Sequence, residues 1–305
     1  MTTLVFGHKS PDTDSTGSPL IWEWFLNHTD IDAKAALLGA PNTEAKFVAE
    51  RWGFELPEII ADVDDNQSCV IVDTNNPAEL PANINNADVL AIIDHHKLAG
   101  GLETKNPINI TVRPLACTAT IMHQMMGDHA SHMPQGIKGL MLSCILSDTL
   151  AFRSPTTTEV DKDLAEALAK DLGVDIDTYA GEMFAAKSDV SAFSDAELLR
   201  MDSKEYAVDG KKFRVSVLET TAPDIVLDRK ASLMETMPKV AEEDGVDQVL
   251  LFVVDILKEE ATMLIPNDLT KTVAEKSFDA KVDGDSVVLP GIMSRKKQII
   301  PALKV

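Results

Sequence analysis

Three short runs of consecutive apolar residues, each bounded by polar clusters, constrain the fold more than any other feature of this sequence. They cover residues 3–7, 69–72 and 89–93, and helix-like stretches separate them. A strand that is apolar on both faces is typical of a parallel sheet covered on both faces by helices. The first half of the chain is therefore expected to be an α/β domain with a parallel sheet.

Stretches with helical composition complete this expected domain. One lies around residues 20–26, after a turn, and two others rich in Ala, Leu and Met cover residues 116–126 and 139–146. A further helix is expected over residues 159–172, because Gly173 follows it as a C-terminal stop. Strands that alternate with helices in this way predict a parallel sheet.

A loosening of the pattern (KSDVSAFSD) marks an expected boundary between two domains. The chain has 305 residues, which is enough for two. We expect an N-terminal domain over residues 1–187, a hinge over 188–194 and a C-terminal domain over 195–305. The C-terminal domain is expected to be smaller and mixed α/β, with a helix over residues 230–241 and a short strand after the basic cluster at 295–297.

Polar side chains follow the apolar runs at the points where the strands would end. Because the carboxyl ends of parallel strands meet at one edge of a sheet, where ligands bind, we expect these side chains to lie close together. A further aspartate comes directly after the apolar stretch LMLSCILS and could reach the same edge. The resulting candidate site consists of His8, Asp12, Asp14, Asp73, His95, His96 and Asp148.

Four carboxylates in one place repel one another unless cations neutralise them. Two divalent ions with a shared carboxylate would do so, and the imidazoles of His8 and His95 would add nitrogen ligands. A set of oxygen and nitrogen ligands without thiolate suits manganese better than a structural zinc. Two such ions activate water and hold leaving oxygens. The pattern therefore predicts a metal-dependent phosphohydrolase.

Each of these residues also has an ordinary structural interpretation. An aspartate after a strand is often a turn former or a helix N-cap, and Asp12 and Asp14 follow Pro11. The conjunction of all seven at one sheet edge is what favours a site. The remaining histidines lie on expected helix faces or in a polar loop and are assigned no role: His28, His123, His129 and His132.

The net charge of −21 argues against a nucleic-acid partner held by general electrostatic attraction. An anionic substrate would need local cations, and the cluster Arg295-Lys296-Lys297 is unusual in so acidic a chain. Arginine offers a planar fork to phosphate oxygens and lysine a point charge. Lys204 is a weaker candidate for the same work. If these residues face the carboxylate edge across the hinge, the active site lies in the cleft between the domains.

Composition also indicates the cellular compartment. No apolar stretch approaches the roughly 20 residues needed to span a bilayer, so no membrane association is expected. The first residues do not resemble a secretory signal. The three cysteines, Cys69, Cys117 and Cys144, fit no zinc or disulfide spacing. Buried free thiols in a reducing cytoplasm are expected.

These residues and their neighbours resemble a known family, the family II inorganic pyrophosphatases of the DHH phosphoesterase superfamily. The likeness runs nearly from end to end. IDHHK alone is a weak signal, but its combination with the other motifs is highly specific. The matching stretches are FGHKSPDTDS, VDTNN, IDHHK, CTATI, LSDTLAFRSPT and SRKKQ.

The resemblance implies a cytoplasmic enzyme that hydrolyses pyrophosphate to two orthophosphates at a dinuclear manganese site, by attack of a metal-bridged hydroxide (EC 3.6.1.1). It implies two Mn²⁺ per subunit, for which Co²⁺ can substitute, and Mg²⁺ that arrives with the substrate. It also implies an N-terminal DHH metal-binding domain, a C-terminal substrate-binding domain and a homodimer formed through the N-terminal domain.

The resemblance further implies a role for each matching residue. One metal would be held by His8, Asp12, Asp73 and Asp148. The other would be held by Asp14, Asp73, His95 and Asp148. His96, as the proton donor at the leaving group, and Asp14 would be the catalytic residues. The phosphates would be bound by Lys204, Arg295 and Lys296.

The sequence departs from the family pattern at one point. The strand aspartate is more often followed by a His and a Glu (DHNE), whereas Thr74 and Asn76 stand here, and partners of metal ligands tune metal affinity. Two alternatives stay open. One is another DHH enzyme, an exopolyphosphatase or an oligoribonuclease-type phosphodiesterase, although no GGGH-like run is present. The other is a non-catalytic phosphate-binding protein that has kept the fold.

Overall fold

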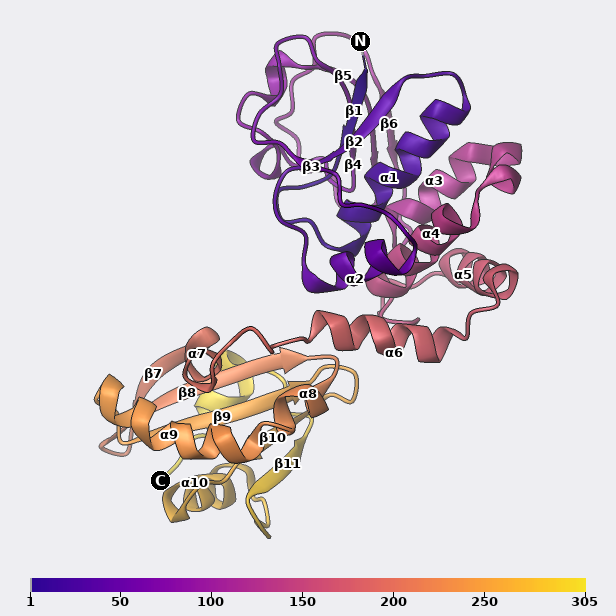
Figure 1. The fold of residues 1–305 in the computed structure, drawn as a ribbon. Helices are drawn as coiled ribbons and strands as arrows, with labels where there is room; N and C mark the ends of the chain where they lie inside the picture. The colour runs from indigo at the N-terminus through magenta and orange to yellow at the C-terminus, as the bar shows by residue number, and fades with distance from the viewer. Residues whose placement is uncertain (1) are drawn as a thin grey trace. The chain divides into compact units, whose positions relative to one another are not determined.

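The computed structural model describes residues 2–305, and the chain divides into two compact units. The first unit ends at Lys187 and the second comprises Ser188–Val305. Each has its own sheet (Figure 1) and its own core of buried side chains.

The first unit is built on a six-stranded sheet in which every pair of neighbouring strands is parallel. Its three central strands are the three apolar runs of the sequence, and this confirms the expected fold class. Chain order reverses between β1 and β4, which creates a switch point where parallel sheets bind ligands. In sheet order the strands are β3 (Glu58–Ile59), β2 (Ala33–Leu37), β1 (Thr3–Phe6), β4 (Ser68–Val72), β5 (Asp88–Asp94) and β6 (Asn109–Val112).

Helices cover one face of this sheet, as Figure 1 shows. They are α1 (Thr13–His28), α2 (Thr43–Arg51), α3 (Thr118–Met126), α4 (Gln135–Asp148), α5 (Glu159–Leu172) and α6 (Ile176–Lys187). On the other face, Phe6 and Ile71 pack against Leu80 and Ile84. Helices were expected on both faces, but on this face the cover consists of loops and of two single-turn 3₁₀ helices, η1 (Pro77–Glu79) and η2 (Ile84–Asn86).

Helix α1 begins earlier than the sequence pattern indicated. The expected turn after β1 is already helical from Thr13, so Asp14 lies in the first turn of α1. Asp12 is the N-cap, and its Oδ1 accepts a hydrogen bond of 3.0 Å from the Ser15 N–H. A Cβ on Gly7 would lie 2.0 Å from Ser15 Oγ, so the close approach of α1 to β1 requires glycine there. Tertiary packing therefore overrides the weak helix propensity of this segment.

The second unit is a mixed five-stranded sheet between two layers of helices, which confirms the expected smaller α/β domain. Strands β8 and β9 are parallel, and the other neighbours are antiparallel. In sheet order the strands are β11 (Ser286–Pro290), β10 (Glu260–Leu264), β9 (Gln248–Asp255), β8 (Lys211–Thr220) and β7 (Ser203–Val208).

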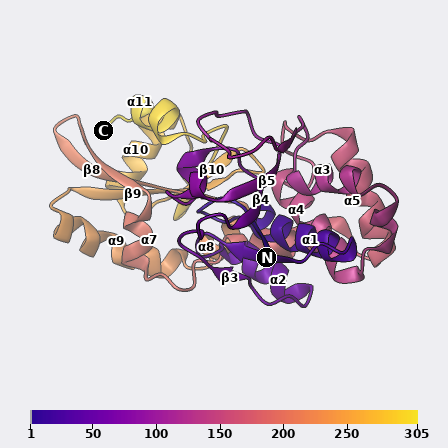
Figure 2. The same ribbon diagram turned by 90° about the horizontal axis from the view of Figure 1, so that it is seen from above.

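Every residue of β9 is buried, because the sheet of the second unit is covered on both sides. Helices α7 (Asp195–Met201) and α9 (Lys230–Asp244) pack on one face, together with the short α8 (Pro223–Leu227). Helix α10 (Asp268–Phe278) and the C-terminal turns pack on the other, as Figure 2 shows.

The prediction of a short strand after the basic cluster is wrong. Residues Arg295–Ile299 form a π-helical turn, η4, and Ile300–Ala302 form the short helix α11. The side chain of Gln298 accepts hydrogen bonds of 2.9 Å from the N–H groups of Met293 and Ser294, and this bends the chain. Ile299 is buried in the core, so its β-branched side chain stabilises a turn instead of a strand.

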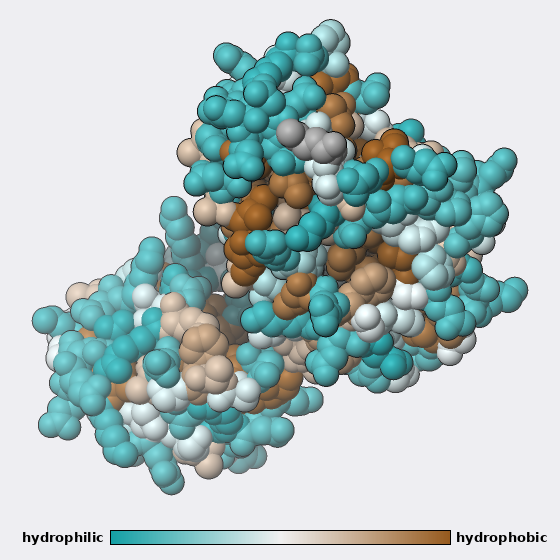
Figure 3. Space-filling view, turned by 45° about the horizontal axis from the view of Figure 1, so that its top comes forward, coloured by the Kyte–Doolittle hydropathy of each residue, from teal (hydrophilic) through white to brown (hydrophobic). Residues whose placement is uncertain are grey.

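The described residues contain no helix long and apolar enough to cross a membrane. Hydrophilic residues cover most of the face shown in Figure 3, and apolar ones form small patches. All three cysteines are buried and free, as expected.

Candidate metal centre

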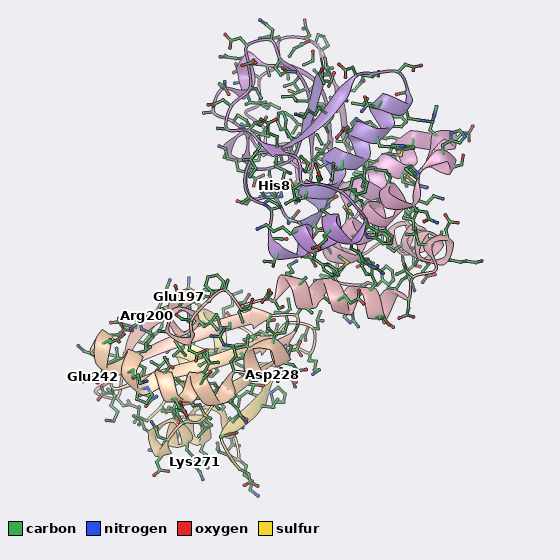
Figure 4. The ribbon with its side chains drawn as sticks, in the orientation of Figure 1. His8, Glu197, Arg200, Asp228, Glu242 and Lys271 are labelled. Atoms are coloured by element: carbon green, nitrogen blue, oxygen red, sulfur yellow. The ribbon has the colours of Figure 1, made fainter. Side chains whose placement is uncertain are left out.

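Asp73 lies at the centre of the residues predicted to form the site. It follows β4 directly, and its two carboxylate oxygens face imidazoles from the neighbouring strand ends. Oδ2 lies 3.5 Å from Nε2 of His8, which follows β1, and Oδ1 lies 3.3 Å from Nε2 of His95, which follows β5. Figure 4 labels His8 in the first unit. The parallel sheet thus brings together side chains that are far apart in sequence.

The backbone of Asp73 adopts an uncommon conformation that the surroundings maintain. Its φ of 57° lies in the left-handed region, which costs free energy for a residue with a Cβ. Its N–H donates to the Ile93 carbonyl at 2.9 Å, and Thr118 Oγ1 donates to its Oδ1 at 3.2 Å. Backbone strain that is maintained in this way is typical of functional sites.

Two further carboxylates, of Asp14 and Asp148, meet behind this group. A ligand atom of each, together with the sulfur of Cys117, lies within 4.8 Å of the others. Asp14 accepts hydrogen bonds from the Thr118 N–H at 2.8 Å and from Ser18 Oγ at 2.6 Å. Oδ2 of Asp148 is buried and has no hydrogen-bond partner among the described residues. A buried carboxylate oxygen without a protein partner is satisfied by an ordered water or a bound cation.

All six predicted ligands lie in groups with metal-binding spacing. The groups are His8, Asp12 and Asp73; Asp73, His95 and His96; and Asp14, Cys117 and Asp148. Asp73 belongs to two of them, which fits the shared role expected for it. The sharing of Asp148 between two metals stays a prediction.

The electrostatics of the centre favour bound cations. Burial, and then the charges of Asp14 and Asp12, raise the pKa of Asp73 well above its ordinary value. Burial and the same neighbours raise the pKa of Asp148. Among the described residues, no lysine or arginine forms an ion pair with these four aspartates. Their mutual repulsion is therefore left for ligands to relieve.

The donor atoms fit manganese. They are carboxylate oxygens and imidazole nitrogens, which suit Mn²⁺. The Nδ1–H of His95 donates to the Leu115 carbonyl at 3.2 Å, and this leaves Nε2 free to coordinate. Burial and the adjacent carboxylates raise the pKa of Cys117 well above its ordinary value, so this thiol stays protonated and is a poor ligand.

Asp94 contacts the candidate site, although it was not predicted as part of it. Its Oδ1 accepts hydrogen bonds from Nδ1 of His96 at 2.9 Å and from the His96 backbone N–H at 3.0 Å. Its Oδ2 accepts one from Asn75. Burial alone would raise the pKa of Asp94, but these hydrogen bonds hold it below its ordinary value. An aspartate two residues before a histidine was the signal in the sequence.

Glu44 was also missed, and no pattern in the sequence distinguishes it from a surface helix residue. It is fully buried in α2 and accepts hydrogen bonds from Thr13 Oγ1 at 2.8 Å and Ser147 Oγ at 2.7 Å. Thr13 follows Asp12, and Ser147 precedes Asp148. Glu44 therefore connects the two helix ends that present these aspartates.

The two residues that depart from the family pattern shape a loop beside the centre. Thr74 Oγ1 donates to Glu79 at 2.6 Å, and the side chain of Asn76 caps η1 through the Ala78 N–H at 3.1 Å. The loop forms one wall of a hollow of about 490 Å³ that His8 and His96 also line. A second hollow, of about 540 Å³, is lined by Asp12, Asp73, His95, His96 and Asp148, among others.

The predicted phosphate-binding residues all belong to the second unit. Lys204 lies exposed on β7, and Arg295 and Lys296 lie in η4. Arg295 donates to the carbonyl of Asp202 at 2.7 Å and forms an ion pair with its carboxylate at 2.7 Å. Because Asp202 is two residues before Lys204, the structure brings these parts of the second unit together.

Two domain models match the chain, one in each unit. The DHH family N-terminal domain matches residues 2–147, and the DHHA2 domain matches residues 181–305.

Several relatives match this chain along nearly its whole length. A probable manganese-dependent inorganic pyrophosphatase of Lactobacillus acidophilus is 35% identical over 98% of this chain and 97% of the relative. A protein of the same name from Archaeoglobus fulgidus is 37% identical over 98% and 96%. The crystal structure of a candidate family II inorganic pyrophosphatase from Methanococcus jannaschii matches with a TM-score of 0.62 and 33% identity, over 99% of this chain and 98% of that one.

Proposed function

The chain belongs to the DHH/DHHA2 family of manganese-dependent inorganic pyrophosphatases, and on this premise we propose that it hydrolyses inorganic pyrophosphate to two orthophosphates. The observation that carries the proposal is that four carboxylates converge at the switch point of a parallel sheet. Among the described residues, no lysine or arginine forms an ion pair with them. A non-catalytic relative would be expected to have lost one of them.

We propose that two Mn²⁺ ions bind in this centre, with Asp73 shared between them. His8 and Asp12 would complete one ligand set with Asp73, and His95 lies on the opposite side of the same carboxylate. Asp14 and Asp148 supply the remaining oxygens. Bound Mn²⁺ neutralises the carboxylates and supplies Lewis acidity to phosphate oxygens and to water.

We propose that His96 gives a proton to the leaving phosphate. Its Nδ1 is held by the anionic Asp94, and its side chain is 53% exposed, so Nε2 is available to the substrate. A carboxylate on Nδ1 fixes the orientation of the ring, so Nε2 carries the proton to be donated when the ring is protonated. The oxygen of the departing phosphate then receives the proton from Nε2 as the P–O bond breaks.

Cations of the second unit are proposed to bind the phosphates of the substrate. A chain with a net charge of −21 repels pyrophosphate at long range, so local positive charge is required. Arg295 offers a planar donor group, and Lys204 and Lys296 are exposed point charges. Ion pairing to Asp202 pre-orients the Arg295 side chain.

One assay separates this proposal from its alternatives. Protein stripped of metal and reloaded with Mn²⁺ is offered pyrophosphate, tripolyphosphate and a dinucleotide while free phosphate is measured. Fast hydrolysis of pyrophosphate supports the proposal. Faster cleavage of the dinucleotide would assign a phosphodiesterase, preference for tripolyphosphate would assign an exopolyphosphatase, and no activity on any of them would favour a binding protein.

We further propose that the first unit forms a homodimer through strand β6. This strand is at one edge of the sheet, and Ile110 and Val112 expose 55% and 38% of their surface. An edge strand with apolar residues is a template for pairing with a second chain. Sedimentation of Ile110→Lys should then give a monomer, whereas an unchanged mass would exclude this edge.

A further inference from the structure

Three histidines gather at the end of the helical layer that is remote from the carboxylate centre. His28 is the last residue of α1, and His129 and His132 lie in the 3₁₀ segment η3 (Gly127–His132), which connects α3 to α4. One ring nitrogen of each lies within 4.8 Å of the others. Helix α1 begins beside Asp12, so its 16 residues separate the two clusters by roughly 24 Å.

The three imidazoles have no hydrogen-bond or ion-pair partner among the residues that the structure describes, and all three residues are exposed. Their rings instead contact one another, with centroids 5.5 Å apart for His28 and His129 and 5.3 Å apart for His28 and His132. Trp24 stacks on His28 at 5.1 Å, and Phe25 contacts the edge of His129 at 5.9 Å. These aromatic contacts orient the rings and leave their nitrogens free.

Three imidazoles are a ligand set for late first-row divalent metals. A tetrahedral zinc with Zn–N bonds of about 2.0–2.1 Å holds its ligand nitrogens roughly 3.4 Å apart. Small rotations of these exposed side chains would bring the nitrogens from within 4.8 Å to that spacing. The negative end of the α1 dipole and the net charge of −21 both favour a cation there. A site with only nitrogen donors selects against Mn²⁺ and Mg²⁺.

We propose that His28, His129 and His132 form a second metal site that binds Zn²⁺, or a neighbouring ion such as Ni²⁺ or Cu²⁺, with water in the fourth position. The ion would connect the C-terminal end of α1 to η3. Since α1, α3 and α4 all reach the carboxylate centre at their other ends, the bound ion would stabilise the helical layer that positions Asp14, Thr118 and Asp148. This inference does not depend on the reaction catalysed at the centre.

The test uses Mn²⁺-loaded protein titrated with Zn²⁺, with bound zinc and manganese both measured by elemental analysis. The wild type is compared with the double variant His129→Gln/His132→Gln. His123→Gln, which changes a histidine of α3 outside the trio, is the matched control. We expect the wild type and the control to bind one zinc more than the double variant. We also expect zinc to raise the melting temperature of the wild type and the control but not that of the double variant. Loss of two ligands should weaken this zinc site at least about tenfold.

Manganese content and pyrophosphate hydrolysis before zinc addition show whether the double variant has an intact fold and centre. If it does not fold, the single variant His28→Gln, at the end of α1, replaces it in the same comparison. Equal zinc binding by the wild type and the trio variants, or zinc uptake matched by manganese release in all proteins, would overturn the proposal.

Discussion

An acidic cluster occurs in each unit, but only the one around Asp244 in the second unit is neutralised by neighbouring arginines. Asp244, at the end of α9, accepts hydrogen bonds from Arg200 at 2.9 Å and from Arg214 at 2.6 Å. Figure 4 labels Arg200 on α7. The same two arginines pair with Glu243 and Glu205 at 2.7 Å. In the first unit, the described residues offer Asp14, Asp73 and Asp148 no such partner.

The pKa values of the two clusters shift in opposite directions. Hydrogen bonds from Arg200, together with the charge of Arg214, lower the pKa of Asp244. Burial and adjacent carboxylates raise the pKa values of Asp73 and Asp148. A cluster with paired charges stabilises the fold. A cluster with unpaired charges of one sign reduces stability until a ligand arrives, which makes it a candidate functional site.

The largest effects should come from removing one unpaired carboxylate. Asp148→Asn should weaken Mn²⁺ binding and lower pyrophosphate hydrolysis by at least about a hundredfold, since even the partners of ligands are worth 10–100-fold. The same change should stabilise the metal-stripped protein by about 1 kcal/mol, because it removes a repelled charge. Calorimetry with Mn²⁺ and urea unfolding with a chelator measure the two effects. Intact manganese sites in the variant would refute the ligand assignment.

His96→Gln tests whether the exposed histidine acts on the substrate and not on the metal. Loss of a proton donor should lower kcat by about 10²–10⁴-fold. Manganese affinity should stay close to that of the wild type. His95→Gln is the matched variant, and it should lose manganese affinity because Nε2 of His95 faces Asp73. Identical behaviour of the two variants would show that the roles of the adjacent histidines are not distinct.

Asp244→Asn should have the opposite consequences to Asp148→Asn. The two arginines would lose their charged acceptor, and the free energy of unfolding should fall by about 2 kcal/mol. Pyrophosphate hydrolysis at 25 °C should be unchanged, since this cluster lies outside the proposed site. Urea unfolding and a phosphate-release assay on the same sample provide the comparison. A variant with an unchanged free energy of unfolding would contradict the claim that the Asp244 cluster stabilises the fold.

The smallest effect is a difference in pH dependence. A carboxyl with a raised folded-state pKa binds more protons when folded, so its contribution to stability falls as pH rises from about 4 through that pKa. Asp244, with a lowered pKa, contributes stability above pH about 4 and loses it as pH falls through the folded-state value. Metal-stripped Asp148→Asn should therefore gain most over the wild type at neutral pH. A gain that grew toward pH 5 would contradict this sign.

The central strands and their terminal residues could be predicted because both follow from local pattern. Apolar runs identified β1, β4 and β5, and the geometry of parallel strands then placed His8, Asp73 and His95 together. Strand β6 was not predicted, since its residues, such as the exposed Ile110, show no clear alternation of apolar and polar side chains.

Features that depend on tertiary packing could not be predicted. The start of α1 at Thr13 depends on a close approach to β1 that only the folded chain creates. Glu44 has a role only because Thr13 and Ser147 meet it across two helices. The prediction of a C-terminal strand was wrong because the side-chain hydrogen bonds of Gln298 outweigh the β propensity of Ile299 and Ile300.

The central claim is that the carboxylates of the first unit are left unpaired in order to hold manganese. Anomalous diffraction at the manganese edge, from a crystal of the Mn²⁺-loaded protein, tests it most directly. We expect two strong peaks in the first unit, both within coordination distance of Asp73. The absence of a peak there, or peaks only at the acidic surface of the second unit, would contradict the account.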